Sequence, residues 1–308
     1  RYHHLFADVL RARLLDEEPE ALAVLHGRAS AWWEQAGERP EAISHAMAGG
    51  LVSRAADLVE LAIPEMSQGR RESTLRRWIQ ELPAEEVAAR PVLSVGHAAM
   101  ALVHGELGEV DAHLSDAERW VDLMAGAPAQ GSLPAGMVVA DHESLRSLPA
   151  AIAVFRAAQA WILGDGTRAS EHARRALDHS LAQGEVTTQD HQRRGAAAGI
   201  LALASWAAGD LDRSHAWWLE SQQSLERAGY LADLRGCALA MADIRIVQGR
   251  LGEALSTVER WLPADAASGQ GDEGAPALRG TADMHVAMAG VLLERGDLVG
   301  ATEHLEAS

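Results

Sequence analysis

The sequence has no lysine, no asparagine and a single cysteine, Cys237. One cysteine excludes a disulfide framework and a cysteine-rich zinc site, and it fits a reducing compartment. Without lysine, the phosphate-binding motif Gly-x-x-x-x-Gly-Lys is also excluded. No apolar run approaches the roughly 20 residues that a membrane-spanning helix needs. We therefore expect a cytoplasmic protein that does not enter a membrane and has no phosphate loop in these 308 residues.

Phenylalanine and tyrosine are also scarce, with two residues of each. Alanine and leucine dominate the 48% of residues that are apolar, which is a helical composition. The 44 acidic residues outnumber the 27 basic ones, all arginine, so the net charge is −17. A surface of this charge repels phosphate backbones, so we expect no direct nucleic-acid binding by this chain.

A short glycine-centred turn motif recurs between runs of small, apolar residues with helical character. It stands at Gly105-Glu-Leu, Gly164-Asp-Gly, Gly209-Asp-Leu, Gly249-Arg-Leu and Gly296-Asp-Leu, in steps of 59, 45, 40 and 47 residues. A period of this size, with a helix on each side of the turn, indicates stacked helical hairpins. We predict an all-α fold, a right-handed superhelix of helix-turn-helix repeats like those of tetratricopeptide (TPR) proteins. Each turn glycine is expected to adopt a left-handed backbone conformation.

Small residues recur at two fixed distances from the turn glycines. Antiparallel helices that approach closer than about 10 Å need small side chains where they cross. We therefore expect both positions to lie at helix crossings. They are Ala98, Ala157, Ala202, Ala242 and Ala289, seven residues before each glycine, and Val110, Ala169, Ser214, Ala254 and Ala301, five residues after it.

Helical spacing and stop signals also divide the first 90 residues. Residues 124–149 and 263–280 are rich in glycine and proline and are predicted as long loops, with a lid over a binding surface as the alternative. In the first 90 residues, four helices are expected over 3–15, from Leu22 to a stop at Gly37, from Glu41 to Gly49, and from Ser53 to Leu61 before Pro64. A fifth helix is expected to end at Leu82, and Pro91 is expected to be the first residue of the helix that follows.

Two tryptophans and several polar residues are candidates for a concave binding surface. Trp161 and Trp206 each lie three residues before a turn glycine, where the first helix of a hairpin faces the groove. Two indoles on one surface would stack on a sugar or an aromatic ligand. The alternative is plain packing between repeats, and the other seven tryptophans, Trp32 among them, are expected in the core.

Charged side chains inside the first helices of hairpins are the second lead. Asp243 and Arg245 interrupt an otherwise apolar stretch over 237–247. A carboxylate and guanidinium groups in a groove suit a small polar ligand or an acidic peptide. The alternative is an internal Asp–Arg ion pair that joins two repeats. With the tryptophans, the predicted ligand-binding set is Trp161, Trp206, Arg194, Arg235, Asp243 and Gln159.

No motif in the sequence supports catalysis or metal binding. Gly269-Gln-Gly271-Asp-Glu-Gly274 matches the dinucleotide pattern G-x-G-x-x-G, but it stands in an acidic loop without a preceding strand. The 14 histidines contain no His-Glu-x-x-His motif, and surface or capping roles account for most of them. We expect neither an enzyme, nor a metal site, nor a cofactor in this chain.

Several sequence blocks in the first 93 residues resemble the junction region of MalT-like regulators, the large ATP-binding regulators of the LuxR family. They occur in the order found in that family, and they are more diagnostic than the repeats from residue 94 onward. The blocks are Tyr2-His-His-Leu-Phe6, Leu10-Arg-Ala-Arg-Leu14, Arg28-Ala-x-x-Trp-Trp-Glu-x-x-Gly37, Glu41-Ala-Ile-x-His-Ala46, Arg54-Ala-Ala56, Trp78-Ile-x-x-Leu-Pro83 and Arg90-Pro-x-Leu93.

The resemblance implies a signal-transducing ATPase that regulates transcription, in which a TPR-like superhelix binds an inducer and controls self-association. We expect this chain to be an internal segment of such a protein, because it opens without methionine. ATP would then bind a missing nucleotide-binding domain, and DNA a missing helix-turn-helix. The predicted domains are the last helix of a winged-helix module (1–18), connecting hairpins (19–90) and the sensor superhelix (91–308). The alternative is a protein–protein interaction module that has no small-molecule ligand.

Overall fold

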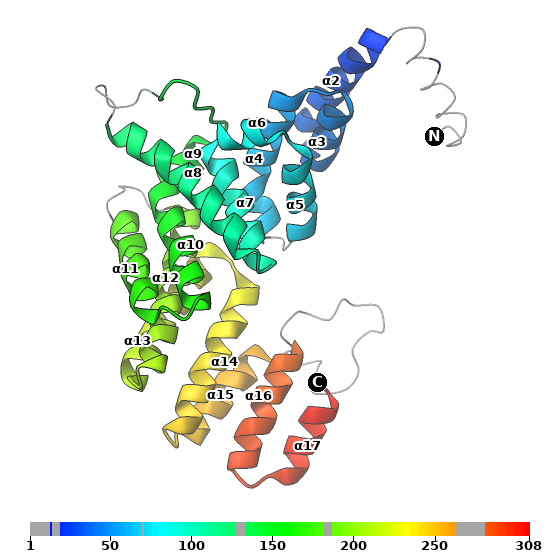
Figure 1. Cartoon of the computed structure of the whole chain (residues 1–308). Helices are drawn as coiled ribbons and strands as arrows, with labels where there is room; N and C mark the ends of the chain where they lie inside the picture. The colour runs from blue at the N-terminus through cyan, green and yellow to red at the C-terminus, as the bar shows by residue number, and fades with distance from the viewer. Residues whose placement is uncertain (1–12, 14–18, 69–70, 127–132, 182–186, 263–280) are drawn as a thin grey trace. The chain divides into compact units, whose positions relative to one another are not determined.

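A computed structural model describes residues 13, 19–68, 71–126, 133–181, 187–262 and 281–308. In this part of the chain there are sixteen helices and no strand, which confirms the all-α, TPR-like fold (Figure 1). None of the helices described has the length and apolar character needed to cross a membrane. The helices are α2 (Pro19–Gln35), α3 (Arg39–Ala48), α4 (Val52–Gln68), α5 (Glu72–Glu81), α6 (Ala84–Ala88), α7 (Pro91–Val103), α8 (Leu107–Ala125), α9 (His142–Arg146), α10 (Leu148–Ile162), α11 (Gly166–Leu181), α12 (Thr188–Ala207), α13 (Leu211–Ala228), α14 (Leu231–Val247), α15 (Leu251–Trp261), α16 (Thr281–Glu294) and α17 (Leu298–Glu306).

The chain divides into two compact units, Arg1–Phe155 and Arg156–Ser308. Within each unit, helices that follow one another in the sequence pack side by side, as in α7 with α8 and α12 with α13. The boundary after residue 90, between the connecting hairpins and the sensor superhelix, remains a prediction from the sequence. Apart from Arg13, the predicted winged-helix segment 1–18 lies outside the described residues, as do the loop 263–280 and its G-x-G-x-x-G motif.

The turn glycines have the predicted left-handed backbone. Their φ angles are 74° at Gly105, 81° at Gly164, 78° at Gly209, 72° at Gly249 and 80° at Gly296. A side chain in this region of φ is strained, so glycine is the residue that allows the tight helix-to-helix turn. Where aspartate follows the glycine it caps the next helix by accepting a backbone N–H bond, through Asp165, Asp210 and Asp297.

Both series of small residues are buried, as expected for positions at helix crossings. Every member is buried, with exposed fractions between 0% and 6%. One hydrogen bond joins the two series directly, because Ser214 Oγ donates to the carbonyl oxygen of Ala202 at 2.9 Å. The recurring small residues therefore set how closely the two helices of each hairpin approach.

The α12–α13 hairpin has an especially close contact at Gly195. A Cβ atom placed there would meet Leu225 Cγ at 2.6 Å and the backbone oxygen of Ser221 at 3.3 Å. Ser221 Oγ donates to the carbonyl oxygen of Gly195 at 2.8 Å. The missing side chain therefore lets α13 lie against the backbone of α12.

Three local expectations were wrong. The predicted loop 124–149 contains helix α9 and the first residues of α10. The helix predicted to stop before Pro64 continues as α4 to Gln68. Proline removes one backbone hydrogen bond, and the buried apolar face on both sides of it, from Leu58 to Met66, outweighs this loss. Trp32 is not in the core, since 60% of its surface is exposed. Its ring instead lies edge-on against Trp33, with centroids 4.6 Å apart.

A buried ion network within the first unit holds the segment before α9 against α4. Arg90 and Glu60 are 1% and 0% exposed, and Arg90 Nη1 donates to Asp57 Oδ1 at 2.6 Å and to Glu60 Oε2 at 3.5 Å. Glu60 Oε1 accepts the backbone N–H groups of Ala140 and Asp141, both at 2.9 Å. Burial raises the pKa of Glu60, while the backbone donors and Arg90 lower it. Part of the predicted loop 124–149 is thus fixed by side chains of α4 and of the residue that precedes α7.

A candidate ligand-binding groove

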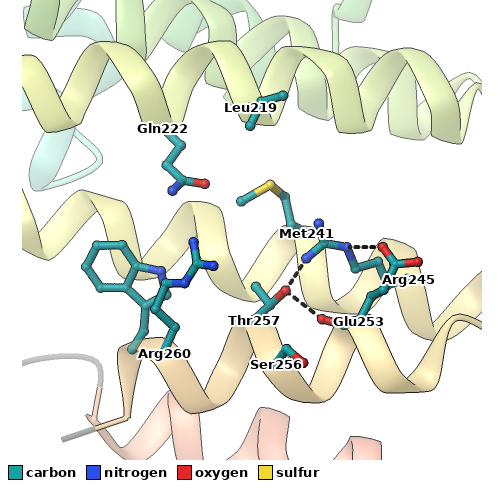
Figure 2. Close-up of a pocket in the computed structure, with 9 residues that line it drawn as sticks. Leu219, Gln222, Met241, Arg245, Glu253, Ser256, Thr257 and Arg260 are labelled. Atoms are coloured by element: carbon teal, nitrogen blue, oxygen red, sulfur yellow. Dashed lines mark hydrogen bonds and ion pairs between the residues drawn. The ribbon is translucent and has the colours of Figure 1, made fainter.

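A polar groove of the second unit lies between α13, α14 and α15, with a volume of about 280 Å³ (Figure 2). We name it the α13–α15 groove. Its chemistry is mixed, with two guanidinium groups, one carboxylate, two hydroxyls, an amide, an indole and two apolar side chains. The lining residues are Leu219, Gln222, Met241, Arg245, Glu253, Ser256, Thr257, Arg260 and Trp261.

Arg245, on α14, is the most enclosed charge of the groove, and its side chain is 18% exposed. Nη1 donates to Thr257 Oγ1, and Nη2 lies 3.4 Å from His215 Nε2. Nε is buried and forms no hydrogen bond with any residue in the described part of the chain. Burial and the neighbouring Arg245 lower the pKa of His215, so that its ring is neutral at pH 7 and accepts from the guanidinium. Arg245 therefore keeps a donor for which the groove supplies no acceptor.

The carboxylate of Glu253 does not fill that role. It lies 3.8 Å from Arg245 Nε, beyond hydrogen-bond distance. Both of its oxygens are held by Arg250, whose Nε donates at 2.8 Å and Nη2 at 2.5 Å. Glu253 is thus neutralised mainly by Arg250, and the guanidinium of Arg245 is left with an incomplete counter-charge.

Arg260 brings a second cation to the opposite end of the groove. It is exposed and forms no ion pair with any residue that the structure describes. Figure 2 shows its side chain reaching from α15 toward Gln222 of α13. Gln222 Nε2 donates to Glu226 Oε1 at 2.8 Å, so the amide oxygen of Gln222 remains as an acceptor. Arg245 and Arg260 therefore present N–H donors to the groove from two sides, in a chain whose net charge is −17.

A second cavity, of about 540 Å³, lies in the first unit among α5 to α8. Ile79, Leu82 and Val87 form an apolar wall. His97 and His113 stack there with ring centroids 3.9 Å apart. Among the described residues, His97 Nδ1 and His113 Nε2 form no hydrogen bond, although His113 Nε2 lies 3.5 Å from Glu109 Oε2. Its acidic residues outnumber the one arginine, Arg76, which is paired with Glu106 at 2.6 Å. This cavity has no spare strong donor comparable to those of the α13–α15 groove.

Histidine pairs join the two helices of three hairpins. His26 and His45 contact through Nδ1 atoms 2.9 Å apart, and His285 and His304 do the same at 2.9 Å. In each pair one ring nitrogen donates and the other accepts, so at least one ring is neutral. The second-helix members His45, His113 and His304 all stand eight residues after a left-handed glycine, so the repeat places them equivalently.

These pairs predict a loss of stability below neutral pH. Burial, and then the charge of His113, lower the pKa of His97 to about 4, and burial and His304 lower that of His285. As the pH falls from about 6.5 toward 4, the unfolded chain binds protons that these folded imidazoles do not, so the free energy of unfolding decreases. Urea unfolding at about pH 7 and pH 5.5 should show a smaller pH effect for His97→Gln/His285→Gln than for the parent.

His142→Gln is the matched control, because His142 is exposed on α9 and outside these pairs. It should keep the pH dependence of the parent chain. Equal pH dependence in the double variant and the parent would contradict the role of the paired histidines.

The six predicted site residues do not line either cavity described above, and their role in binding stays a prediction. Trp161 and Trp206 are partly exposed near the ends of α10 and α12. Gln159 is 8% exposed and accepts from Arg156. Arg194 Nη2 donates to Glu220 Oε1 at 2.7 Å, an ion pair within the α12–α13 hairpin.

Arg235 and Asp243 share α14 with the groove. Arg235 is partly buried. Asp243 is exposed and stands between Met241 and Arg245 in the sequence, about 200° around the helix from each of them. The side chains of Asp243 and Arg245 therefore leave the helix on opposite sides and do not pair with each other.

Most of the groove was missed from the sequence, although Arg245 was noticed as a charge inside an apolar run. A signal for the rest lies on α15, where Glu253, Ser256, Thr257 and Arg260 follow a 3-1-3 spacing that forms one polar stripe of a helix. Such a stripe is also the ordinary pattern of a solvent-facing surface. Only the position of α13 turns it into the wall of a cavity.

Residues 150–308, which include all of α13, α14 and α15, match the family described as the MalT-like TPR region. The chain belongs to the MalT-like TPR family. The resemblance seen in the first 93 residues and the match over the second half thus agree.

Curated relatives and a solved structure extend this result. The serine/threonine-protein kinase PknK of Mycobacterium tuberculosis, like that of Mycobacterium bovis, is 39% identical over 95 residues, which is 31% of this chain. That alignment spans only 9% of the length of PknK. The crystal structure of BtubC (BKLC) from P. vanneervenii aligns with a TM-score of 0.52 and 15% identity, over 80% of this chain and 88% of that one. At this identity the likeness to BtubC concerns the fold alone.

Proposed function

We propose that this MalT-like TPR chain is the ligand-sensing and self-association scaffold of a LuxR/MalT-like, ATP-dependent transcriptional regulator. The observation that supports this most directly is that the family match over 150–308 contains the whole α13–α15 groove. In this proposal the chain is cytoplasmic and non-catalytic, and binds neither ATP nor DNA itself. Ligand binding in the groove favours one arrangement of the helices, and that shift in population controls self-association.

The test is a screen of sugars and metabolites against the whole chain, read as a rise in melting temperature. A ligand that binds only the folded chain raises its stability in proportion to the logarithm of its concentration. Ser256→Trp places an indole in the groove and should abolish the rise. Gln223→Trp, at an exposed position of α13 that does not line the groove, should keep it. A hit that Ser256→Trp still binds would remove the groove from the proposal, and the absence of any hit would count against a small-molecule sensor.

A protein–protein interaction module without a small ligand is the second candidate. Large apolar side chains are exposed just before several turns, and such surfaces mark interaction sites when they gather. They include Val103, Leu163 and Val247, with exposed fractions of 66%, 64% and 66%. Sedimentation velocity separates the two candidates. Assembly that depends on chain concentration alone favours the interaction module, whereas assembly that needs a ligand favours the sensor.

A further inference from the structure

We propose that the α13–α15 groove selects organic anions, binding a carboxylate or phosphate group between Arg245 and Arg260 and the apolar body of the ligand beside Leu219 and Trp261. This inference rests on the proposed sensor function and names the chemical class of its ligand. A sugar bound without charge would satisfy the proposed function and contradict this inference.

The first support is the hydrogen-bonding state of Arg245. A guanidinium has five N–H donors, and this one has a buried Nε without a partner. A buried donor without an acceptor costs about 1–3 kcal/mol. The nearest possible acceptors are already engaged, since Thr257 Oγ1 accepts from Arg245 Nη1 and the carboxylate of Glu253 accepts from Nε and Nη2 of Arg250. An oxyanion beside the exposed part of the Arg245 guanidinium would supply the missing counter-charge.

The second support is the charge balance of the groove. Arg245 and Arg260 face a single acid, Glu253, and that acid is held by Arg250 from outside the lining set. The cavity is therefore locally positive on a chain whose net charge is −17. Charge-assisted bonds from arginine to carboxylate or phosphate are among the strongest polar contacts in proteins.

The third support is the size and apolar content of the site. A volume of about 280 Å³ is near the lower end of small-molecule sites, which excludes a large polymer from full burial. Leu219, Met241 and Trp261 supply the apolar surface, and the indole offers a flat face to a ring. A compact anion with one ring or a short aliphatic body fits this combination.

The experiment uses four probes on the whole chain by isothermal titration calorimetry. Benzoate and phenyl phosphate test the two oxyanions, inorganic phosphate tests the anion without a body, and benzyl alcohol tests the body without charge. We expect saturable binding of benzoate or phenyl phosphate, weaker binding of inorganic phosphate, and none of benzyl alcohol. Arg245→Met and Arg260→Met should each weaken the binding about tenfold, as the loss of one charge-assisted bond predicts.

Arg260→Met keeps the experiment decisive if Arg245→Met misfolds, because Arg260 is exposed and pairs with no described residue. Arg39→Met, at a surface ion pair with Glu65 in the first unit, is the matched control and should bind as the parent does. Equal affinity for benzyl alcohol and benzoate, unchanged affinity in both groove variants, or no saturable binding of either organic anion would overturn the inference. If the metabolite screen finds an uncharged ligand whose binding Ser256→Trp abolishes, the proposed sensor function is supported and the inference of an anionic ligand is contradicted.

Discussion

Replacing Arg90 by methionine is expected to lower the free energy of unfolding by about 3–5 kcal/mol, because it leaves the carboxylate of Glu60 buried without its cation. Glu60 is 0% exposed and would keep only the two backbone N–H donors of Ala140 and Asp141. The loss should shrink as the pH falls, because burial raises the pKa of Glu60 and a protonated carboxyl no longer needs a counter-charge. Guanidinium unfolding of the whole chain, followed by circular dichroism, measures it.

Two further variants separate this network from surface ion pairing. Arg39→Met removes an ion pair to Glu65 in which both side chains are at least 36% exposed, and should cost less than about 1 kcal/mol. In Arg90→Met/Glu60→Gln both charges are gone, and part of the lost stability should return. A loss below about 1 kcal/mol for Arg90→Met, or a double variant no more stable than the single one, would show that the network is not a stabilising element.

Gly195→Val is expected to destabilise the chain by about 1–3 kcal/mol, because the α12–α13 contact has no room for a side chain. Its Cβ would lie 2.6 Å from Leu225 Cγ and 3.3 Å from the backbone oxygen of Ser221. The side chain of Leu225 can rotate only within its own packing, and the backbone of α13 must move to relieve the second contact. The same unfolding experiment measures the change.

Gly236 is the matched glycine on a neighbouring helix. A Cβ atom there meets nothing within 4 Å, so Gly236→Ala gains helix propensity without a clash. It should raise the free energy of unfolding by about 0.5–1 kcal/mol. If Gly195→Val leaves the free energy of unfolding unchanged or raises it, the close approach of α12 and α13 at Gly195 does not limit packing there.

Features that depend on near neighbours in the chain could be predicted from the sequence. The turn at Gly209 is one case, because glycine tolerates a φ of 78° and Asp210 caps the helix that follows. The crossing of Ala202 with Ser214 is another, since the two residues are 12 positions apart and the turn fixes their distance. Local rules therefore give the hairpins and most of their boundaries.

Pro64 shows where the local rules were insufficient. A proline is a strong local signal for a helix end, but its cost of roughly 3 kcal/mol is a local quantity. The apolar residues of α4 on both sides of Pro64 bury against other helices of the first unit, in one core with Ile43, Leu75 and Leu93. That gain depends on residues distant in the sequence, so it could not be weighed from the local pattern.

The candidate site was harder to predict than the fold, for the same reason. The groove brings together Gln222 of α13, Arg245 of α14 and Arg260 of α15. The first and last of these residues are 38 positions apart in the sequence. Each of these side chains alone fits an ordinary exposed helix face. Trp161 and Trp206 were chosen because each stands three residues before a turn glycine, but they line neither of the two cavities. A position within a hairpin does not by itself decide which other helices lie opposite the side chain.

The sequence by itself determined an all-α chain of glycine-linked hairpins with small residues at the crossings, because turn conformation and close helix approach are set by residues near one another in the chain. Only the tertiary structure decided which charges are compensated. Arg250 holds Glu253, Arg245 keeps a buried donor without an acceptor, and Glu60 is neutralised by Arg90 thirty residues later. Ion pairing depends on distances of a few ångströms between helices, and those distances are set by packing rather than by sequence spacing.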